Sequence, residues 1–538
     1  MELFKKLFFF ENNLFYFILL SLFFHLLAAY FSVGYYQQDE HFSVLEPINY
    51  KLGKDSTLGW DYFKLYDRSW FLSYIFYLTT KLVSLFNFNS PFTWTLFYRI
   101  TASILGWFSI ICMIHLSKKI LKDKISFYIS VIISTLLWFY PYFHARTSSE
   151  NIGCSFLIIG ITFFLFSNKF QYYKSILFLS GLIFGLSFLS RYTNIIPLVF
   201  FGFWALMINK NKFNELFITS FGFIIIFILG ILIDYWGYNQ ILLSSFNYFL
   251  VNYQHNQMNY FPSHPWWFHF YFIIKEFLPP LSIFVLISII LFWIKLPKNF
   301  ITWVTLPLFF FLSIISHKET RYLFPILIFT PIFLGFLVEN YFIYKKFFMN
   351  IFIKYILNLL IGLTVTINFI VLIVLSTTPA NNSINLFKFL YNNSYNIEKL
   401  YVMDKIPYRK SDLLINFYRN DNLKLVKVFE FEKCPINVLD SNIETPYKEK
   451  QIYSYPNWFY KYDILCNKKN FLNNYVLSLE NTYFLFSDLE YLNFFNNEYK
   501  SQCNLIYNTF PLWTLNYNYN NWLKRTTKWY LYNCNFRR

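Results

Sequence analysis

Residues 14–33 read LFYFILLSLFFHLLAAYFSV, and residues 34–41, which follow, read GYYQQDEH. The first stretch contains no Asp, Glu, Lys or Arg and has the length of roughly 20 residues that a helix needs to cross a bilayer. Lys5 and Lys6 precede it and no small-residue cleavage site follows it, a pattern typical of a retained span and not of a removed signal peptide. Asp39 and Glu40 therefore come directly after a predicted membrane span.

The rest of the chain is as apolar as this first span. Of its 538 residues, 56% are hydrophobic, 25% are aromatic and only 14% are charged, which excludes an ordinary soluble globular protein. The formal net charge is +17. The lysines, however, stand in short clusters between apolar runs and not on one basic face, so they indicate membrane topology and not nucleic-acid binding.

Apolar runs that are long enough to cross a bilayer, or nearly so, recur as far as residue 375. We predict about eleven spans, over residues 14–33, 94–116, 125–143, 152–166, 176–189, 195–208, 216–233, 277–294, 300–315, 322–338 and 355–375. The run 72–86, which Lys81 interrupts, is typical of an interfacial or partly inserted helix.

The lysine clusters orient the predicted spans. Counting from a cytoplasmic N-terminus places each cluster on the cytoplasmic side, in agreement with the positive-inside rule; the residues concerned are Lys118, Lys119, Lys122, Lys124, Lys169, Lys174, Lys210, Lys212, Lys295, Lys298, Lys345 and Lys346. The same count places outside the membrane the segments 34–71, 144–151, 190–194, 235–271 and 316–321, and the chain after residue 375. We therefore predict an α-helical polytopic domain over residues 1–376, with an outer loop at 34–71, and an extracytoplasmic mixed α/β domain over residues 377–538.

The cysteines divide between these two domains. Cys112 and Cys154 lie in apolar runs, where a buried hydrophobic role is expected. Cys434, Cys466, Cys503 and Cys534 lie in the polar C-terminal part without the close spacing of a zinc site. In an oxidising compartment they can form up to two disulfides.

The acid pair of the first outer loop is the first candidate for chemistry. Burying ionised groups beside hydrocarbon is costly unless they are paired or functional. Asp39 or Glu40 can act as a general base toward a hydroxyl within hydrogen-bond reach. The alternative is a solvated loop carboxylate.

A second candidate is the stretch SHKETRYLFP, residues 316–325, between two apolar runs. It contains His317, Lys318, Glu319 and Arg321 within five consecutive positions. Such a mixture suits a phosphate-bearing ligand, because Lys supplies a point charge and Arg a fork of donors. The alternative is a charged loop that only terminates helices, but its cations fall on the side where topology lysines are not expected.

Two further constellations lie on the same predicted side. The stretch FPSHPWWFH, residues 261–269, offers aromatic faces to a sugar or a lipid, although Trp also favours the bilayer interface. The stretch RTSSE, residues 146–150, lies at an outer helix end, and Arg191 lies between two apolar runs. These charges are either functional or no more than caps.

In this order, the pieces resemble the dolichyl-phosphate-mannose-dependent mannosyltransferases that build N-glycan and glycosylphosphatidylinositol (GPI) precursors, a family with the C-type glycosyltransferase (GT-C) fold. The Pro-Asp-Glu motif of that family corresponds to residues 38–40, with Gln38 in place of Pro. Its His-Lys-Glu-(Glu/Asp)-Arg-Phe motif corresponds to residues 317–322, with Thr320 and Tyr322 as departures. Arg146, Thr147 and Glu150 look like its Arg-Thr…Glu segment, and residues 263–266 are similar to the Ser-His-Pro-Trp of the third GPI mannosyltransferase.

The resemblance implies an inverting transfer of mannose from a polyprenyl-phosphate donor, such as dolichyl-phosphate mannose, to a hydroxyl of a lipid-linked glycan. It implies no cofactor and no metal, since the donor is not a nucleotide diphosphate. Asp39 is the expected general base, with Glu40 as the second choice or as a supporting partner.

The resemblance also assigns roles to the other candidates. The departing phosphate would be neutralised by His317, Lys318 and Arg321. The sugar or the acceptor would lie near His264 and Trp266. Supporting roles fall to Glu319, Arg146, Glu150 and Arg191.

Other functions with many spans remain open from the sequence. A transporter or flippase also has few ionisable residues, but usually near the bilayer midplane. A transferase of another sugar or of phosphoethanolamine is a nearer alternative. The site would face the endoplasmic reticulum lumen in a eukaryote and the periplasm in a bacterium.

Overall fold

The computed structural model of the chain describes residues 12–210, 213–254, 261–343, 351–402, 405–410, 413–420, 422–430, 463–467, 482–487, 503–511, 513–514 and 526–535. Several residues used above lie outside the described residues: Lys5, Lys6, Lys212, Lys345, Lys346 and Cys434.

Contacts divide the chain into two compact units. Unit 1 comprises Met1–Val33, Asp61–Asn89 and Thr93–Thr378, and unit 2 comprises Gly34–Trp60, Ser90–Phe92 and Pro379–Arg538. The first part of the outer loop thus groups with the chain after Pro379, a division that the hydropathy pattern does not indicate.

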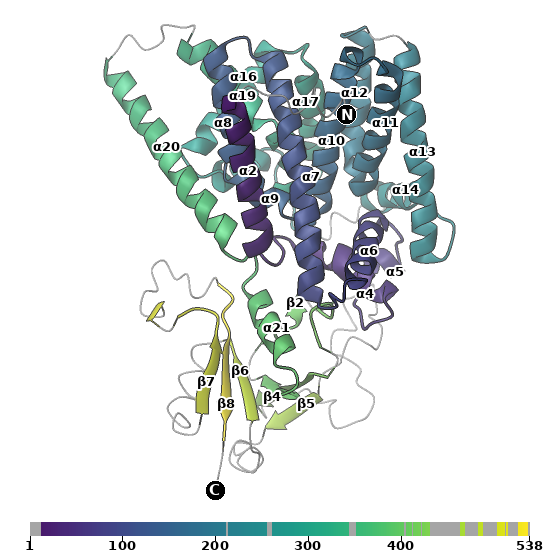
Figure 1. The fold of residues 1–538 in the computed structure, drawn as a ribbon, viewed down its shortest axis with the longest axis vertical. Coiled ribbons are helices and arrows are strands. Elements are labelled where there is room, and N and C mark those ends of the chain that lie inside the picture. Colours follow the sequence, from purple (N-terminus) through teal and green to yellow (C-terminus); the bar gives the residue numbers. More distant parts are fainter. Residues whose placement is uncertain are drawn as a thin grey trace. The chain divides into compact units, whose positions relative to one another are not determined.

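Unit 1 consists of helices (Figure 1). Its longer helices are α2 (Asn12–Phe31), α6 (Phe71–Ser84), α7 (Pro91–Ile120), α8 (Lys124–Leu136), α10 (Ser149–Phe166), α11 (Tyr173–Ser190), α12 (Ile195–Met207), α13 (Phe213–Tyr238), α16 (Leu281–Lys295), α17 (Phe300–Ile314) and α20 (Ile351–Thr377). Its shorter pieces are α5 (Trp60–Phe63), α9 (Phe139–His144), η2 (Ser167–Lys169), η3 (Tyr192–Asn194), α14 (Ser244–Phe249), η4 (Leu250–Gln254), α15 (Phe268–Glu276), η6 (Thr320–Leu323), α18 (Phe324–Leu327), α19 (Thr330–Leu337) and η7 (Val338–Ile343). Helices satisfy their backbone hydrogen bonds internally, which long apolar runs in lipid require.

Within the described residues, six helices are long and apolar enough to cross a membrane, or up to eight spans if each of two bent pairs counts as one. The eleven predicted runs all form helices, but five of them form α8, α12, α16, α17 and the bent α18–α19 segment, which do not meet this length on their own. α16 and α17 meet at 115°. The number of spans therefore stays a prediction, because short apolar helices and breaks cannot be resolved by hydropathy alone.

Helix α11 packs closely against α10 and against α13 (Figure 1). A Cβ at Gly181 of α11 would collide with the carbonyl of Thr219 on α13. On the other side of α11, Ser187 donates a hydrogen bond of 2.7 Å to the carbonyl of Gly153 on α10. Small residues at such contacts let backbones approach. The end of α11 and the start of α10, which carry Arg191 and Glu150, are thereby held together.

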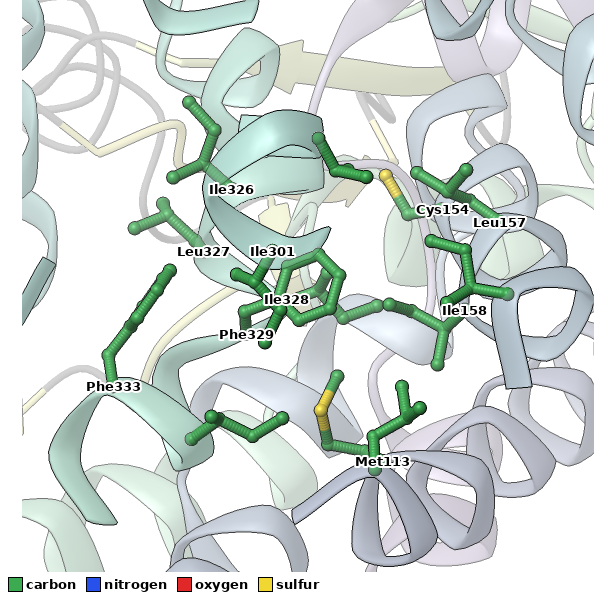
Figure 2. Packing of buried hydrophobic residues seen from close by; sticks show 14 of the residues in the cluster. Met113, Cys154, Leu157, Ile158, Ile301, Ile326, Leu327, Ile328, Phe329 and Phe333 are labelled. Atoms are coloured by element: carbon green, nitrogen blue, oxygen red, sulfur yellow. The ribbon is translucent and has the colours of Figure 1, made fainter. Parts of the chain in front are cut away.

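The core of unit 1 lies where α10 meets the segment after Pro325. Figure 2 shows Cys154 and Leu157 of α10 near Ile328 and Phe329, and all four side chains are fully or almost fully buried. The prediction that Cys154 is a buried hydrophobic residue is confirmed, as it is for Cys112. This core supports the end of α10 from which Glu150 projects.

Buried polar groups fix the C-terminal end of α2. The guanidinium of Arg99 donates to the carbonyl of Ala29 at 2.7 Å, and that of Arg146 donates to the carbonyl and the hydroxyl of Ser32 at 2.5 and 2.9 Å. One turn earlier, the rings of His25 and His144 are hydrogen-bonded at 2.9 Å. Cations at a helix C-terminus satisfy its orphan carbonyls and oppose its dipole. The chain thus leaves α2 in a fixed direction.

Unit 2 contains a mixed sheet and short helices. The helices are α3 (Gln38–Glu40), the π-helical turn η1 (His41–Leu45), α4 (Glu46–Lys51) and α21 (Ser383–Asn392). The strands are β1 (Lys399–Val402), β2 (Arg409–Lys410), β3 (Leu413–Leu414), β4 (Lys424–Glu430), β5 (Asp463–Asn467), β6 (Thr482–Phe486), β7 (Cys503–Asn508) and β8 (Tyr530–Cys534). The main sheet has the order β5-β4-β1-β6-β8-β7, in which β8 pairs antiparallel with β6 and β7 while the β1, β4, β5 and β6 pairs are parallel (Figure 1).

Two features tie unit 2 together. Cys503 and Cys534, which are paired across β7 and β8, form a disulfide. Gly34 has φ of +96°, and a Cβ there would lie 2.8 Å from that of Asn381. Only glycine combines this backbone with so close an approach, so residue 34 can pack directly against the start of α21.

Candidate active site

A cavity in unit 1 gathers charged and aromatic side chains from four separate segments. Glu150 comes from the first turn of α10, Arg191 from the residue after α11, and Arg321 from η6. Tyr248 and Tyr253 come from α14 and η4. The remaining lining residues are Cys154, Thr193, Asn194, Leu308, Leu312, Ile315, Tyr322 and Pro325. Two guanidinium groups and one carboxylate thus lie together in a largely aromatic and apolar cavity.

Glu150 joins the two arginines. Its Oε1 lies 2.9 Å from Nη1 of Arg191 and 3.6 Å from Nε of Arg321. The three side chains are 3%, 12% and 9% exposed, so water screens them little. Removing one partner of a buried ion pair costs about 3–5 kcal/mol. Glu150 therefore holds two like charges together that would otherwise repel.

Glu319 holds Arg321 from the other side. Its carboxylate accepts hydrogen bonds of 2.5 and 3.2 Å from Nε and Nη2 of Arg321, and the ring of Tyr322 lies 5.8 Å from that guanidinium and 5.4 Å from that of Arg191. A forked arrangement fixes the guanidinium plane as well as its position. The expected role of Glu319, to hold the cations in place, agrees with this geometry.

His317 also contacts Glu319. Its Nε2 lies 3.1 Å from Oε1 of Glu319, and its Nδ1 lies 3.1 Å from the carbonyl of Pro262. The hydrogen bond to Glu319 raises the pKa of His317 above its ordinary 6.5, against the burial that lowers it. The charged imidazolium is therefore favoured in the folded protein. The stabilisation that its hydrogen bond with Glu319 provides is present at low pH and is lost as the pH rises through the raised pKa.

This pKa gives a test of the role of His317. We expect the affinity for polyprenyl-phosphate mannose to fall roughly fivefold between about pH 6 and pH 8, as one partly exposed charge worth about 1 kcal/mol is lost. The phosphodiester of this probe does not titrate in that range, unlike a phosphate monoester. Equilibrium binding to the purified protein measures the effect. His317→Gln should remove the pH dependence and His115→Gln, on α7, should keep it; a pH dependence that survives in His317→Gln would contradict the assignment.

Lys318 takes a different position. Its Nζ donates to the carbonyl of Ile315, the residue that follows α17, and the residue is 2% exposed. Neither Lys318 nor His317 lines the cavity, whereas Arg191 does. The prediction that Lys318 binds the phosphate stays a prediction. Of Lys318 and Arg191, it is Arg191 that lies in the cavity beside Arg321.

The loop 261–268 is joined to the stretch 316–321. The amide of His264 donates to the carbonyl of Ser316 at 2.8 Å, and Ser263 and His317 form an antiparallel bridge. The ring of His264 stacks on Phe268 at 4.1 Å between centroids. Trp266 is 65% exposed, as suits an interfacial ring or a ligand platform. Two motifs that were separate in the sequence thus form one structure around His317.

Arg146 lies apart from this cavity. It is 1% exposed and bonded to Ser32, as described above. Asn151 donates to its carbonyl at 2.6 Å. Its contacts are those of a residue that positions α2, which fits the supporting role expected for it.

The acid pair lies in unit 2, at the first turn after the loop 32–37. The Oε1 of Glu40 accepts hydrogen bonds from the amides of Tyr36 and Gln37 at 2.9 and 3.2 Å, and Glu40 is 3% exposed. Its carboxylate therefore caps the turn on which the pair stands. Asp39 is partly exposed. Of the two carboxylates, Asp39 is thus the better placed to meet a substrate hydroxyl.

In the part of the chain that the structure describes, no group of three or more His, Cys, Asp or Glu side chains is arranged to hold a metal ion. The expectation of a reaction without metal stays a prediction.

Among the polar and aromatic residues of the cavity, sequence reasoning missed Thr193, Asn194, Tyr248 and Tyr253. The chain contains 45 tyrosines, so nothing in the pattern distinguishes the two that line the cavity. The position of Thr193 and Asn194 directly after Arg191 was the one usable signal.

Comparisons with known proteins agree with this picture. The model of the Alg9-like mannosyltransferase family matches residues 16–461. GPI mannosyltransferase 3 of Candida albicans is 26% identical over 354 residues, 64% of this chain and 67% of that protein. The protein of the same name from Debaryomyces hansenii is 24% identical and covers 69% and 66%, and GPI alpha-1,2-mannosyltransferase 3 of Bos taurus is 24% identical and covers 57% and 56%. This chain therefore spans about two thirds, or somewhat less, of the length of these relatives.

Among solved structures, ArnT from Cupriavidus metallidurans bound to undecaprenyl phosphate is similar with a TM-score of 0.51 and 10% sequence identity, over 96% of this chain and 97% of that one. At this identity the likeness shows the fold alone, and the predicted GT-C type of fold is confirmed to that extent.

Proposed function

This chain belongs to the Alg9-like mannosyltransferase family, and on that premise we propose that it transfers mannose from a polyprenyl-phosphate donor, such as dolichyl-phosphate mannose, to a hydroxyl of a GPI precursor. The acceptor class comes from the names of the relatives, which are GPI mannosyltransferases. The observation that carries the donor class is the cavity in which Arg191 and Arg321 share Glu150.

The donor phosphate would bind between the two arginines. A phosphodiester carries one negative charge and gains more when the bond to the sugar breaks, so preorganised cations stabilise the transition state more than the ground state. Glu150 and Glu319 keep both guanidinium groups oriented before the donor arrives. The apolar and aromatic lining excludes water, which strengthens these charges.

The transfer step needs one base and one leaving group. The acceptor oxygen attacks the anomeric carbon, its proton passes to Asp39, and the bond from the anomeric carbon to the phosphate oxygen breaks with its electrons on the phosphate. Attack opposite the leaving group inverts the configuration. In the donor, the phosphate already serves as the leaving group that activates mannose. We propose that no metal or other cofactor takes part.

We place the reaction on the lumenal side of the endoplasmic reticulum membrane. The lysine clusters support this side, since they assign the segments with Asp39 and Arg321 to the face opposite the cytoplasm. The Cys503–Cys534 disulfide supports it for unit 2, because disulfides persist in oxidising compartments.

Reconstituted protein tests the proposal. Purified protein in liposomes is given polyprenyl-phosphate mannose with a radiolabelled sugar, together with a mannosylated GPI precursor as acceptor. We expect label to appear in the acceptor with a new glycosidic bond, and not when the donor is a nucleotide sugar. Label that crosses sealed vesicles without a new bond would instead establish a transporter, and transfer to a different acceptor would place the protein with another transferase.

A further inference from the structure

Glu46 is a fully buried carboxylate at the junction of three chain segments of unit 2. It is 0% exposed. Its Oε1 lies 2.8 Å from Nε2 of His41 and accepts hydrogen bonds from the amides of Asn416 and Phe417 at 2.7 and 3.0 Å. Its Oε2 accepts a hydrogen bond of 2.8 Å from the amide of Thr57. One side chain therefore links the outer loop to the chain after Pro379.

These contacts suit a carboxylate and no other side chain. Three of the four partners are backbone amides, which can only donate. Burying an ionised carboxylate costs several kcal/mol unless such donors compensate it. A further hydrogen bond, which does not involve Glu46, joins the same segments: Nδ2 of Asn416 donates to the hydroxyl of Thr57 at 2.9 Å. An isosteric Gln would point an NH₂ group at one of these donors.

The junction lies within the helical segment that carries Asp39, at the start of α4. α3, η1 and α4 follow one another without a break from Gln38 to Lys51, so Asp39 is seven residues, about two turns, before Glu46. The ring of His41, which contacts Glu46, also stacks on Tyr418 at 5.8 Å. A fixed Glu46 therefore fixes the axis and the rotation of the segment on which Asp39 is carried.

We propose that Glu46 is a positioning residue for the reaction: it clamps the Asp39-bearing segment to residues 416–417, and thereby sets where the general base meets the acceptor hydroxyl. This inference rests on the proposed function, in which Asp39 is the base. Glu46 itself touches no substrate. A displacement of about 1 Å at a reacting group costs on the order of 10²-fold in rate, so a loosened clamp should appear in kcat.

Glu46→Gln and Glu46→Asp test the clamp. Asp retains the charge and both acceptor oxygens but is one methylene shorter, so it serves as the conservative variant and as the second chance if Gln does not fold. For each variant, the stoichiometry of polyprenyl-phosphate mannose binding gives the number of intact donor sites, and kcat is expressed per such site. Because these sites lie in unit 1, the folding of unit 2 is measured separately, by hydrogen exchange of the backbone amides of β1, β6 and β8. A residue with only a structural role would lose this protection together with kcat, whereas a positioning residue loses kcat with the protection intact.

We expect kcat per donor site to fall about 10–100-fold in Glu46→Gln, less in Glu46→Asp, with the donor KM unchanged in both. Glu339→Gln is the matched control: Glu339 is 9% exposed and accepts hydrogen bonds from the amides of Lys122 and Asp123, in unit 1. Its kcat per site should equal that of the wild type.

Two results would overturn the inference: wild-type kcat per site in both Glu46 variants, or a loss of kcat that occurs only together with a loss of hydrogen-exchange protection in unit 2. Asp39→Asn separates this failure from failure of the proposed function. If Asp39→Asn is inactive while the Glu46 variants are normal, only the clamp is wrong; if Asp39→Asn is fully active, the assignment of the base itself is wrong.

Discussion

Asp39→Asn is expected to lower kcat for mannosyl transfer by about 10²–10⁴-fold, the contribution of a positioned general base, and to leave the binding of polyprenyl-phosphate mannose unchanged. The physical reason is that Asn is nearly isosteric with Asp but cannot take up the acceptor proton. Asp39 is partly exposed, so the substitution buries no new unpaired group. Initial rates with radiolabelled donor, together with equilibrium binding of the donor, measure the two quantities separately.

Two neighbouring carboxylates provide controls for this variant. Glu40→Gln keeps an oxygen that can accept from the amides of Tyr36 and Gln37, so we expect a loss of no more than a few fold. Asp55→Asn changes an exposed carboxylate in the same outer loop and should have no effect. If Glu40→Gln is inactive and Asp39→Asn is not, the two carboxylates exchange roles.

Arg321→Gln is expected to lower kcat/KM by about 10²–10³-fold, the usual effect of removing one preorganised donor from a developing anion. Arg321 lies in the cavity with Arg191, and Glu319 holds its guanidinium through two hydrogen bonds. Glu150 keeps its contact of 2.9 Å with Arg191 in this variant, so the cavity retains one ion pair. Steady-state rates across donor concentrations, with thermal unfolding as a check on folding, measure the effect.

Arg68→Gln is the matched control. Arg68 also lies in unit 1 and pairs with a carboxylate, that of Asp61 at 2.8 Å, but neither residue lines the cavity. We expect kcat/KM of this variant to equal that of the wild type. Equal losses in Arg68→Gln and Arg321→Gln would show that the effect is one of stability, and the phosphate-binding assignment would then fail.

A double variant addresses whether Asp39 and Arg321 act in one reaction. If Asp39 and Arg321 act on the same transition state, the combined loss in Asp39→Asn/Arg321→Gln should be smaller than the product of the single losses, as is usual for groups that act as a unit.

The sequence predicted the helical membrane domain well because lipid imposes simple rules. Runs such as 14–33 and 355–375 satisfy the length and the absence of charge that a span requires, and both are helices. What hydropathy could not resolve were the breaks. Pro325 and Pro331 stand in the first turns of α18 and α19, and the helical stretches there meet at 60°. One apolar run thus became two short helices.

The candidate site was predicted in its chemistry more than in its geometry. The charges of 317–321 were conspicuous because they interrupt apolar runs. The contacts of the individual charged side chains were not predictable. Lys318 donates a hydrogen bond to a carbonyl at a helix end, and Arg191, an isolated charge in the sequence, pairs with Glu150. Such pairings depend on which helix ends meet in space. The glycine and serine contacts of α11 decide that here, and a single sequence gives no direct signal for them.

The hydrogen bonds between Glu46 and the amides of residues 416 and 417 have a consequence for biosynthesis. Their partners are separated by 370 positions along the chain, so at about 5–20 residues per second the ribosome needs roughly 20–75 s to deliver the second half of this contact after the first has been translated. During that interval Glu46 lacks two of its three amide donors, and only the amide of Thr57 has been translated. Folding of this region therefore cannot finish before residues 416 and 417 have been translated, and any premature stop codon before position 416 leaves the loop without its closing partner, however complete the helices upstream are.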